Sequence, residues 1–188
     1  FQELDHQHDE AWIGGPGIPS YSFGRGTLGF LGDNETVYFQ SEETGYSHLY
    51  TYNLKSKKKT QLTKGNWEVR NVNLSKDKKS FYLTTTTTHP GNRDFYKLEV
   101  ANAVLQPILT KDGAHEVSLS PDESTLIVRY SYKNKPWELY VAPNKKNTNL
   151  IQITTSTSES FKKYAWREPD VITFKAQDGI PVNARLYK

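Results

Sequence analysis

The chain has 188 residues and contains neither cysteine nor methionine. Without cysteine the protein has no disulfide framework and no thiolate metal site. Cysteine content therefore does not distinguish an oxidising from a reducing compartment. Because a translated chain begins with methionine, the phenylalanine at position 1 leads us to expect a processed product or a piece of a longer protein. Long apolar runs are missing as well. None approaches the ~18 residues of a membrane span, so we expect no membrane-spanning helix.

A large excess of one charge is also missing. Lysine and arginine number 24 against 21 aspartates and glutamates, which gives a formal net charge of +3. Nucleic-acid binding proteins gather their basic residues into one footprint, and this sequence does not. The lysine clusters fall in predicted turns, where charge keeps hairpin tips soluble, at residues 57–59, 78–79 and 145–146. We therefore expect no nucleic-acid partner.

What the sequence does contain is an internal repeat of about 45 residues. Aspartates in predicted turns recur as Asp33, Asp77 and Asp122, spaced by 44 and 45 residues. Other landmarks recur in the same order, namely a strand tyrosine at 50, 96 and 140 and a Leu-Thr or Ile-Thr pair at 62, 109 and 153. A period of about 40–50 residues with several short strands is typical of β-propeller blades.

Each repeat contains four predicted strands, separated by turns rich in glycine, asparagine, aspartate or lysine. Helical periodicity and helix-capping patterns are missing. We therefore predict an all-β fold, a partial β-propeller of about three four-stranded antiparallel blades with flanking pieces. The predicted strands cover residues 27–31, 36–41, 47–53, 58–63, 67–74, 80–87, 95–100, 105–110, 115–119, 125–132, 137–142 and 150–154.

The repeat also sets the expected boundaries. We expect the end of a preceding blade and a loop in residues 1–25, with outer strands of that blade within residues 1–12. The last segment lies outside the repeat and is expected to form a hairpin around Gln177, Asp178 and Gly179. The expected divisions are 1–25, blades at 26–65, 66–111 and 112–155, a linker or next strand at 156–168, and the hairpin segment at 169–188.

Three blades form an arc rather than a closed ring. An arc exposes an apolar face at each end, here near residues 30–39 and 125–132 or their partners. Exposed faces larger than a few hundred Å² tend to be covered. We therefore expect either further blades in a longer native chain or self-association through the end blades.

One cluster near the start of the chain suggests a metal site. His6 and His8 lie on one extended segment beside Asp9 and Glu10. Zinc needs three or four converging ligands, and no other histidine completes this shell. We therefore favour an exposed polar segment.

The pair Glu42 and Glu43 invites comparison with paired carboxylates that hold a substrate ammonium group. The pair occupies a hairpin turn, a position that is usually solvated. No Gly-x-Ser-x-Gly sequence occurs, there is no cysteine nucleophile, and no histidine follows His115 to close a catalytic triad. We therefore assign no catalytic, cofactor-binding or metal-binding residue and do not expect this chain to hydrolyse peptides by itself.

Two motifs resemble a known family. Residues 41–50 (SEETGYSHLY) and 62–69 (LTKGNWEV) closely resemble the late blades of the dipeptidyl peptidase IV propeller. In that group a Ser-Glu-x-x-Gly-(Tyr/Trp)-x-His turn leads to a Thr-Lys-Gly-x-Trp-Glu-Val blade junction. Residues 89–96 (HPGNRDFY) look like its Pro-Gly-x-Arg-x-(Leu/Phe)-Tyr segment. Residues 174–188 look like the hairpin that opens the α/β-hydrolase domain of prolyl-oligopeptidase-type serine peptidases.

The resemblance implies a serine exopeptidase that removes dipeptides from peptide N-termini, with a propeller that caps the hydrolase domain and gates access to it. The catalytic Ser, Asp and His of the family would then lie after Lys188. Its substrate-binding glutamate pair would lie before Phe1, so Glu42 and Glu43 are not that pair. The family's substrate-lining arginine has no clear counterpart in the loop 14–20.

The resemblance also implies the partners, which are the hydrolase domain of the parent protein and peptide substrates. A periplasmic or secreted location follows from the resemblance alone. The alternative is a TolB-like propeller that serves only as a protein-binding scaffold, since propellers host many functions. The hairpin at 170–187 favours the peptidase, because a binding propeller has no need of it.

Overall fold

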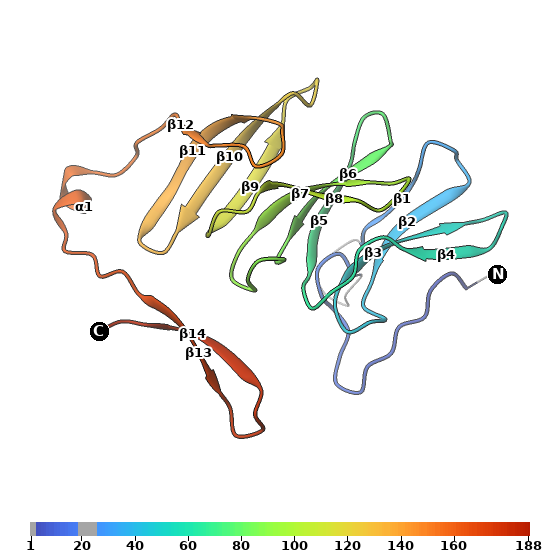
Figure 1. Ribbon diagram of the computed structural model, residues 1–188, viewed down its shortest axis with the longest axis horizontal. Coiled ribbons are helices and arrows are strands. Elements are labelled where there is room, and N and C mark those ends of the chain that lie inside the picture. Colours follow the sequence, from blue (N-terminus) through green and yellow to red (C-terminus); the bar gives the residue numbers. More distant parts are fainter. Residues whose placement is uncertain (1–2, 19–25) are drawn as a thin grey trace.

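The computed structural model describes residues 3–18 and 26–188. Three four-stranded antiparallel sheets follow one another along the chain and stand side by side in an arc (Figure 1). A two-stranded hairpin follows them outside the arc (Figure 1), and some of its residues line a pocket together with loops of the second and third sheets. The repeat predicted this all-β partial propeller, and the prediction is confirmed.

In each large sheet, strands that are consecutive in sequence are neighbours in space. This meander is the construction of a propeller blade. The first sheet holds β1 (Leu28–Phe30), β2 (Thr36–Ser41), β3 (His48–Asn53) and β4 (Lys58–Gln61). The second holds β5 (Val69–Leu74), β6 (Ser80–Thr85), β7 (Asp94–Glu99) and β8 (Leu105–Leu109), and the third holds β9 (Ala114–Leu119), β10 (Thr125–Tyr132), β11 (Lys135–Pro143) and β12 (Ile151–Gln152).

The repeated aspartates stabilise the turn between the first two strands of each sheet. Each accepts a hydrogen bond from a backbone N–H two or three residues later, at 2.9 to 3.1 Å. The residue that follows each aspartate has a positive φ of 55–59°. Residues other than glycine seldom adopt this left-handed backbone conformation, and the hydrogen bonds to the aspartate side chains help to stabilise it. The three residues are Asp33, Asp77 and Asp122.

Strand β6 occupies the middle of the arc and is buried along its whole length. Phe81 and Leu83 belong to a core cluster that includes Leu49 of the first sheet. Tyr82 belongs to a second cluster that includes Leu126 of the third sheet. Because successive side chains of a strand point to opposite faces, one strand joins both blade interfaces. This explains the continuous apolar run in the sequence.

The start of the chain differs from the prediction. The described residues 3–18 contain no strand, so the outer strands expected within residues 1–12 do not form there, and Phe1 and Gln2 lie outside the described residues. Residues 3–10 contain a single apolar side chain, Leu4, which is too little to bury one face of a strand. Part of the expected loop, residues 19–25, also lies outside the described residues.

This N-terminal segment changes one end of the arc. Leu4 packs against a cluster on the first sheet that contains Val37 and Phe39, both buried. The exposed face expected near residues 30–39 is therefore covered at Val37 and Phe39, whereas Phe30 stays 51 % exposed. The face expected near residues 125–132 is open, since Ile127 is 46 % exposed. The two ends of the arc are unlike.

The segment after the third sheet contains a short helix, α1 (Glu159–Lys163), capped by the Ser158 hydroxyl, which accepts a hydrogen bond from the N–H of Phe161. A linker or strand was expected there. The predicted hairpin is present as β13 (Asp170–Lys175) and β14 (Pro181–Leu186). In the described parts of the chain, no helix is long and apolar enough to cross a membrane.

Candidate functional site: a polar groove along β5 and β9

A groove of about 870 Å³ runs along β5 and β9, the first strands of the second and third sheets. Gly14 and Pro16 of the N-terminal segment form part of its wall. Each first strand is the edge of its sheet, and residues on one face of it point away from the blade core. Polar side chains such as Asn71 and Asn73 of β5 are exposed there. We call this the β5–β9 groove.

Arg70 enters the groove from an irregular point of β5. Val69 pairs with Thr85 and Asn71 pairs with Thr84, so the register shifts and Arg70 stands opposite no residue of β6. A bulge of this kind re-aims a side chain and is common next to functional sites. Arg70 is half-buried and lines the groove.

Arg93, just before β7, is held by its backbone. Its N–H donates to the carbonyl of Gly113 at 2.9 Å, and its own carbonyl accepts from Nδ1 of His115 at 2.7 Å. The guanidinium donates one hydrogen bond to the carbonyl of Asn92 at 2.8 Å. Burial lowers the pKa of Arg93, and the positive charge of Arg70 lowers it further. The two guanidiniums therefore act on each other within one groove.

His115 lies beneath the groove wall and is 1 % exposed. Its ring stacks on Tyr130, with ring centroids 5.0 Å apart. Because a carbonyl only accepts, Nδ1 carries the hydrogen that is donated to Arg93. Nε2 is then a buried acceptor with no hydrogen-bond partner among the described residues. Burial lowers the pKa of His115, which keeps the ring neutral.

The third sheet supplies the other wall. Glu116 of β9 forms an ion pair with Arg129 of β10 at 2.9 Å. The Arg129 guanidinium in turn lies 5.0 Å from the ring centroid of Trp137, which is 39 % exposed. The carboxylate of Glu116 is thus engaged within its own sheet, and Trp137 presents an aromatic surface to the groove.

The family-like motif at 41–50 and 62–69 forms a blade junction around His48. The carbonyl of Gly65 accepts from Nε2 of His48 at 2.9 Å, so Nδ1 is the acceptor for the Thr63 hydroxyl at 3.0 Å. Thr63 also accepts from the N–H of Leu49 at 2.9 Å. The edge of Trp67 packs on the ring, with centroids 5.0 Å apart. His48 is therefore a structural residue, and burial lowers its pKa.

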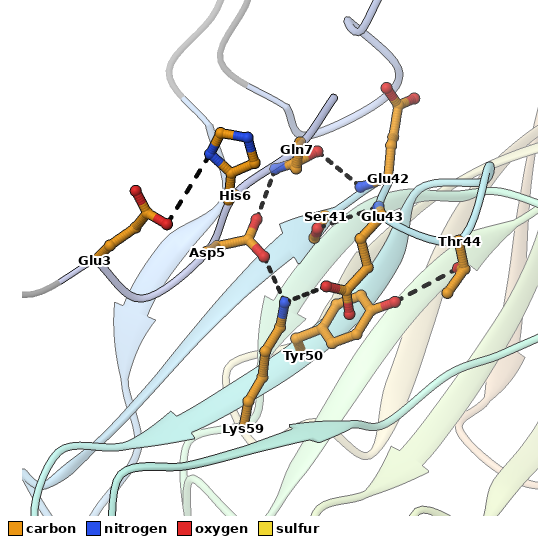
Figure 2. Close-up of polar contacts among 10 residues, drawn as sticks. All are labelled: Glu3, Asp5, His6, Gln7, Ser41, Glu42, Glu43, Thr44, Tyr50 and Lys59. Carbon is orange, nitrogen blue, oxygen red and sulfur yellow. Dashed lines mark hydrogen bonds and ion pairs between the residues drawn. The ribbon is translucent and has the colours of Figure 1, made fainter. Parts of the chain in front are cut away.

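The Glu42–Glu43 turn has a structural role in this chain (Figure 2). Glu42 accepts from the N–H of Gly14 at 3.1 Å, and its own N–H donates to the side chain of Gln7 at 2.8 Å. Glu43 forms an ion pair with Lys59 at 2.5 Å. The predicted solvated turn is thus only partly solvated, because its groups hold the N-terminal segment.

Lys59 is the centre of these contacts. Its ammonium group lies 2.5 Å from carboxylate oxygens of both Asp5 and Glu43, and 4.9 Å from the ring centroid of Tyr50 (Figure 2). Burial acts to lower the pKa of Lys59, but hydrogen bonds to the two carboxylates outweigh it, and the pKa is raised. The cluster binds the N-terminal segment to the first sheet.

The candidate metal ligands do not converge. His6 is paired at 3.9 Å with Glu3. Over residues 3–18 and 26–188, no group of three histidine, aspartate or glutamate side chains could hold a metal ion. His48, His89 and His115 lie on other parts of the fold, far along the chain from His6 and His8.

The sequence alone assigns no site residue and does not predict the groove. Arg93 belongs to the family-like motif at 89–96, and Arg70 lies outside the motifs at 41–50, 62–69 and 89–96. One signal was available: the first strand of the second repeat reads Val-Arg-Asn-Val-Asn-Leu, in which Asn71 and Asn73 alternate with Val72 and Leu74 and so indicate one polar face. This signal does not predict that two arginines share one groove. A bulge at Arg70 and a loop 23 residues further along the chain bring them together.

The sequence was also compared with known proteins. The family described as dipeptidyl peptidase IV (DPP IV) N-terminal region matches residues 7–137. "Dipeptidyl peptidase 4" of Trichophyton equinum is 28 % identical over 167 residues, which cover 85 % of this chain and 22 % of that protein. "Dipeptidyl peptidase 4" of Arthroderma otae is 31 % identical over 149 residues, which cover 76 % of this chain and 19 % of that protein.

The chain thus spans about a fifth of the length of these relatives. The match to the family covers most of the chain and includes the first two sheets and β9 and β10 of the third. It contains the His48 junction and both groove arginines. The resemblance read from the motifs at 41–50 and 62–69 is therefore confirmed, and the chain belongs to the dipeptidyl peptidase IV N-terminal region family.

Proposed function

We propose that this chain is the non-catalytic β-propeller portion of a dipeptidyl-peptidase-like serine exopeptidase of the prolyl oligopeptidase type. In this role it caps an α/β-hydrolase domain that lies outside the present sequence and gates the access of peptides to it. The observation that carries the proposal is the polar β5–β9 groove along an arc of three blades, followed by a hairpin that leaves the arc.

The chemistry of the groove suits a peptide. An extended peptide offers N–H and C=O groups along its whole length, and the groove presents guanidinium and amide side chains in return, with Trp137 for apolar side chains. Catalytic groups are not required of this part. The sequence contains no Gly-x-Ser-x-Gly and no cysteine, which agrees with chemistry performed elsewhere in a longer protein.

The hairpin supports the same role. β13 and β14 pair over six residues each, and all but one of those residues are exposed. Val171, Phe174 and Leu186 are among the exposed side chains, at 47, 51 and 39 %. A two-stranded hairpin with so much exposed apolar surface is marginal by itself and needs a further element to pack on. A hydrolase domain is the partner we propose.

The coding sequence beyond Lys188 is the first test. A downstream Gly-x-Ser-x-Gly sequence supports the proposal, and a stop codon directly after Lys188 contradicts it. The second test uses a chromogenic Xaa-Pro dipeptide amide. We expect the 188-residue chain to give no turnover and the full-length product of the reading frame to give turnover. Turnover by the short chain that is lost on mutating one of its residues would contradict the proposal.

Gating is tested separately in the full-length protein. Since this chain has no cysteine, Asn73→Cys gives a single thiol in the β5–β9 groove that a bulky maleimide can modify. We expect the label to slow cleavage of a long peptide more than cleavage of the small dipeptide amide. Lys145→Cys, in an exposed turn, is the matched control, and labelled wild type controls for thiols elsewhere. Equal rates for labelled Asn73→Cys and labelled Lys145→Cys would contradict gating through this groove.

A protein-binding scaffold is the second candidate, and one observation favours it. The outer face of the third sheet exposes Ile127, Ile151 and Ile153 at 46, 63 and 52 %. Propellers use such surfaces to bind proteins as well as to pack blades. A stop codon directly after Lys188 would support the scaffold function and contradict the peptidase.

A further inference from the structure

The β5–β9 groove contains two guanidiniums that no carboxylate neutralises. Neither Arg70 nor Arg93 has an ion pair within 4.0 Å in the described residues 3–18 and 26–188. Each guanidinium has five N–H donors. A single one of the ten is bound within the described residues, by the carbonyl of Asn92. Half-buried arginines usually donate these hydrogen bonds to an anion. The groove therefore has free donors that could bind an anion.

Nearby acidic side chains have other partners. Glu116 pairs with Arg129. Asp94 is buried, and its oxygens accept from the N–H and hydroxyl of Thr88 at 2.8 and 2.9 Å. These hydrogen bonds are local to their own loops and strands. They leave the positive charge of the two arginines available to a ligand.

One further carboxylate belongs to the surroundings. Glu68 precedes β5 and attracts Arg70 at longer range, while its own oxygen accepts from the N–H of Ser47 at 2.8 Å. Burial raises the pKa of Glu68. Its attraction therefore offsets only part of the charge of Arg70.

Both arginines are also held in place by the backbone. The bulge in β5 sets the direction of Arg70, and the bridge between Arg93 and Ala114 joins the β7 loop to β9. The carbonyl of Arg93 is held by His115 as well. A site whose groups are fixed before the ligand arrives loses less entropy on binding. Backbone irregularities at both arginines thus point to ligand binding more than to packing.

We propose that Arg70 and Arg93 form a carboxylate-binding site for peptides in the β5–β9 groove. The identity of the ligand as a peptide rests on the proposed function, whereas the preference for a carboxylate rests on the two unneutralised guanidiniums. Two planar forks can bind the oxygens of one carboxylate with several charge-assisted hydrogen bonds. The carboxylate is either the C-terminus of a short peptide or an acidic side chain, and both present the same group.

Binding of defined peptides to the 188-residue chain tests the site. Three tetrapeptides of alanine and proline are compared by calorimetric or NMR titration at low salt: one with a free C-terminal carboxylate, one with a C-terminal amide, and one amide with an internal aspartate. We expect the free acid or the aspartate peptide to bind about tenfold more tightly than the neutral amide, as a charge-assisted contact gives. The tighter of the two identifies the source of the carboxylate.

Two variants locate the contact. Arg70→Gln and Arg93→Gln are each expected to remove most of the preference for the carboxylate and to leave binding of the neutral amide within about twofold. Lys145→Gln removes the same charge from an exposed turn and is expected to keep the preference. Arg70 lies in a bulge at the groove surface, so Arg70→Gln decides the matter if Arg93→Gln does not fold, and circular dichroism establishes the fold of each variant.

Equal affinity of wild type for all three peptides, the free acid, the aspartate amide and the neutral amide, would overturn the site. So would an equal loss of preference in Lys145→Gln, since the attraction would then be a general effect of net charge. Neither result would bear on the peptidase proposal, which depends on the downstream reading frame and on turnover by the full-length protein.

Discussion

Lys59 and Asp5 lie 54 residues apart in the sequence, yet the ammonium group of one is 2.5 Å from the carboxylate of the other. Both side chains are largely buried, at 25 and 14 % exposure. This contact and the neighbouring one to Glu43 bind the N-terminal segment across the face of the first sheet (Figure 2). The segment thus covers part of the face on which a neighbouring blade would pack.

We therefore predict that Lys59→Met releases the N-terminal segment. The change leaves two carboxylates without a counter-charge, and we expect a loss of about 1–3 kcal/mol in the free energy of unfolding. Limited proteolysis is expected to cut first within residues 3–18, and urea titration measures the stability. Lys55→Met, at an exposed pair with Glu35, is the control and is expected to change stability by less than about 0.5 kcal/mol. Equal effects of the two variants would contradict a special role for Lys59.

The buried histidines predict a pH dependence. Burial lowers the pKa of His48 and of His115 in the folded state, so the unfolded chain binds protons more strongly. Their contribution to stability is complete above the unfolded pKa of about 6.5 and is lost as pH falls below it toward the folded pKa values. Each histidine contributes at most about 1.4 kcal/mol per pH unit in that window.

Urea titrations between pH 7.5 and pH 5 measure the slope of the free energy of unfolding against pH. His48→Gln retains a donor and an acceptor but does not titrate, so we expect it to be less stable at pH 7.5 and to depend less on pH. His6→Gln, at an exposed site, is the control and is expected to keep the wild-type slope. A slope for His48→Gln equal to that of wild type would show that His48 does not titrate in this range.

The packing of the core predicts where the loss of a side chain lowers the free energy of unfolding most. Phe81 is fully buried in the cluster between the first and second sheets and meets the edge of Tyr38, with ring centroids 4.9 Å apart. We expect Phe81→Ala to cost about 3–5 kcal/mol in the free energy of unfolding, as measured by urea titration. Ile127→Ala, on the open face of the third sheet, is expected to cost less than about 1 kcal/mol. A cost below 1 kcal/mol for Phe81→Ala would contradict face-to-face packing of the first two blades.

The open end of the arc predicts self-association of the 188-residue chain. Ile127, Val141 and Ile151 are directly paired across three strands and so share one face. We propose that two chains meet through this face, and sedimentation at increasing concentration is expected to show a dimer. Ile127→Lys should give a monomer, while Leu54→Lys, at an exposed turn of the first sheet, should not. A stable wild-type monomer at tens of micromolar would contradict the proposal.

Local sequence was enough for the blades. The period of the repeat, the turn aspartates and the apolar run around Phe81 each report on a few consecutive residues, and strands and hairpin turns depend on such short-range patterns. The predicted strands therefore agree with the observed ones to within a few residues, apart from those expected in residues 1–12. The same is true of the hairpin of β13 and β14, whose turn residues and alternation are local signals.

The family could also be read from local sequence, because the motif around His48 brings together residues that lie close along the chain. The tertiary structure decided the remainder. Whether Glu42 and Glu43 are solvated depends on a segment 28 and more residues away that folds back over them. Whether Arg70 and Arg93 share a groove depends on a bulge and on the packing of two blades. Such contacts join distant parts of the chain, and no pattern of neighbouring residues encodes them, since their energy exists only after the blades have packed.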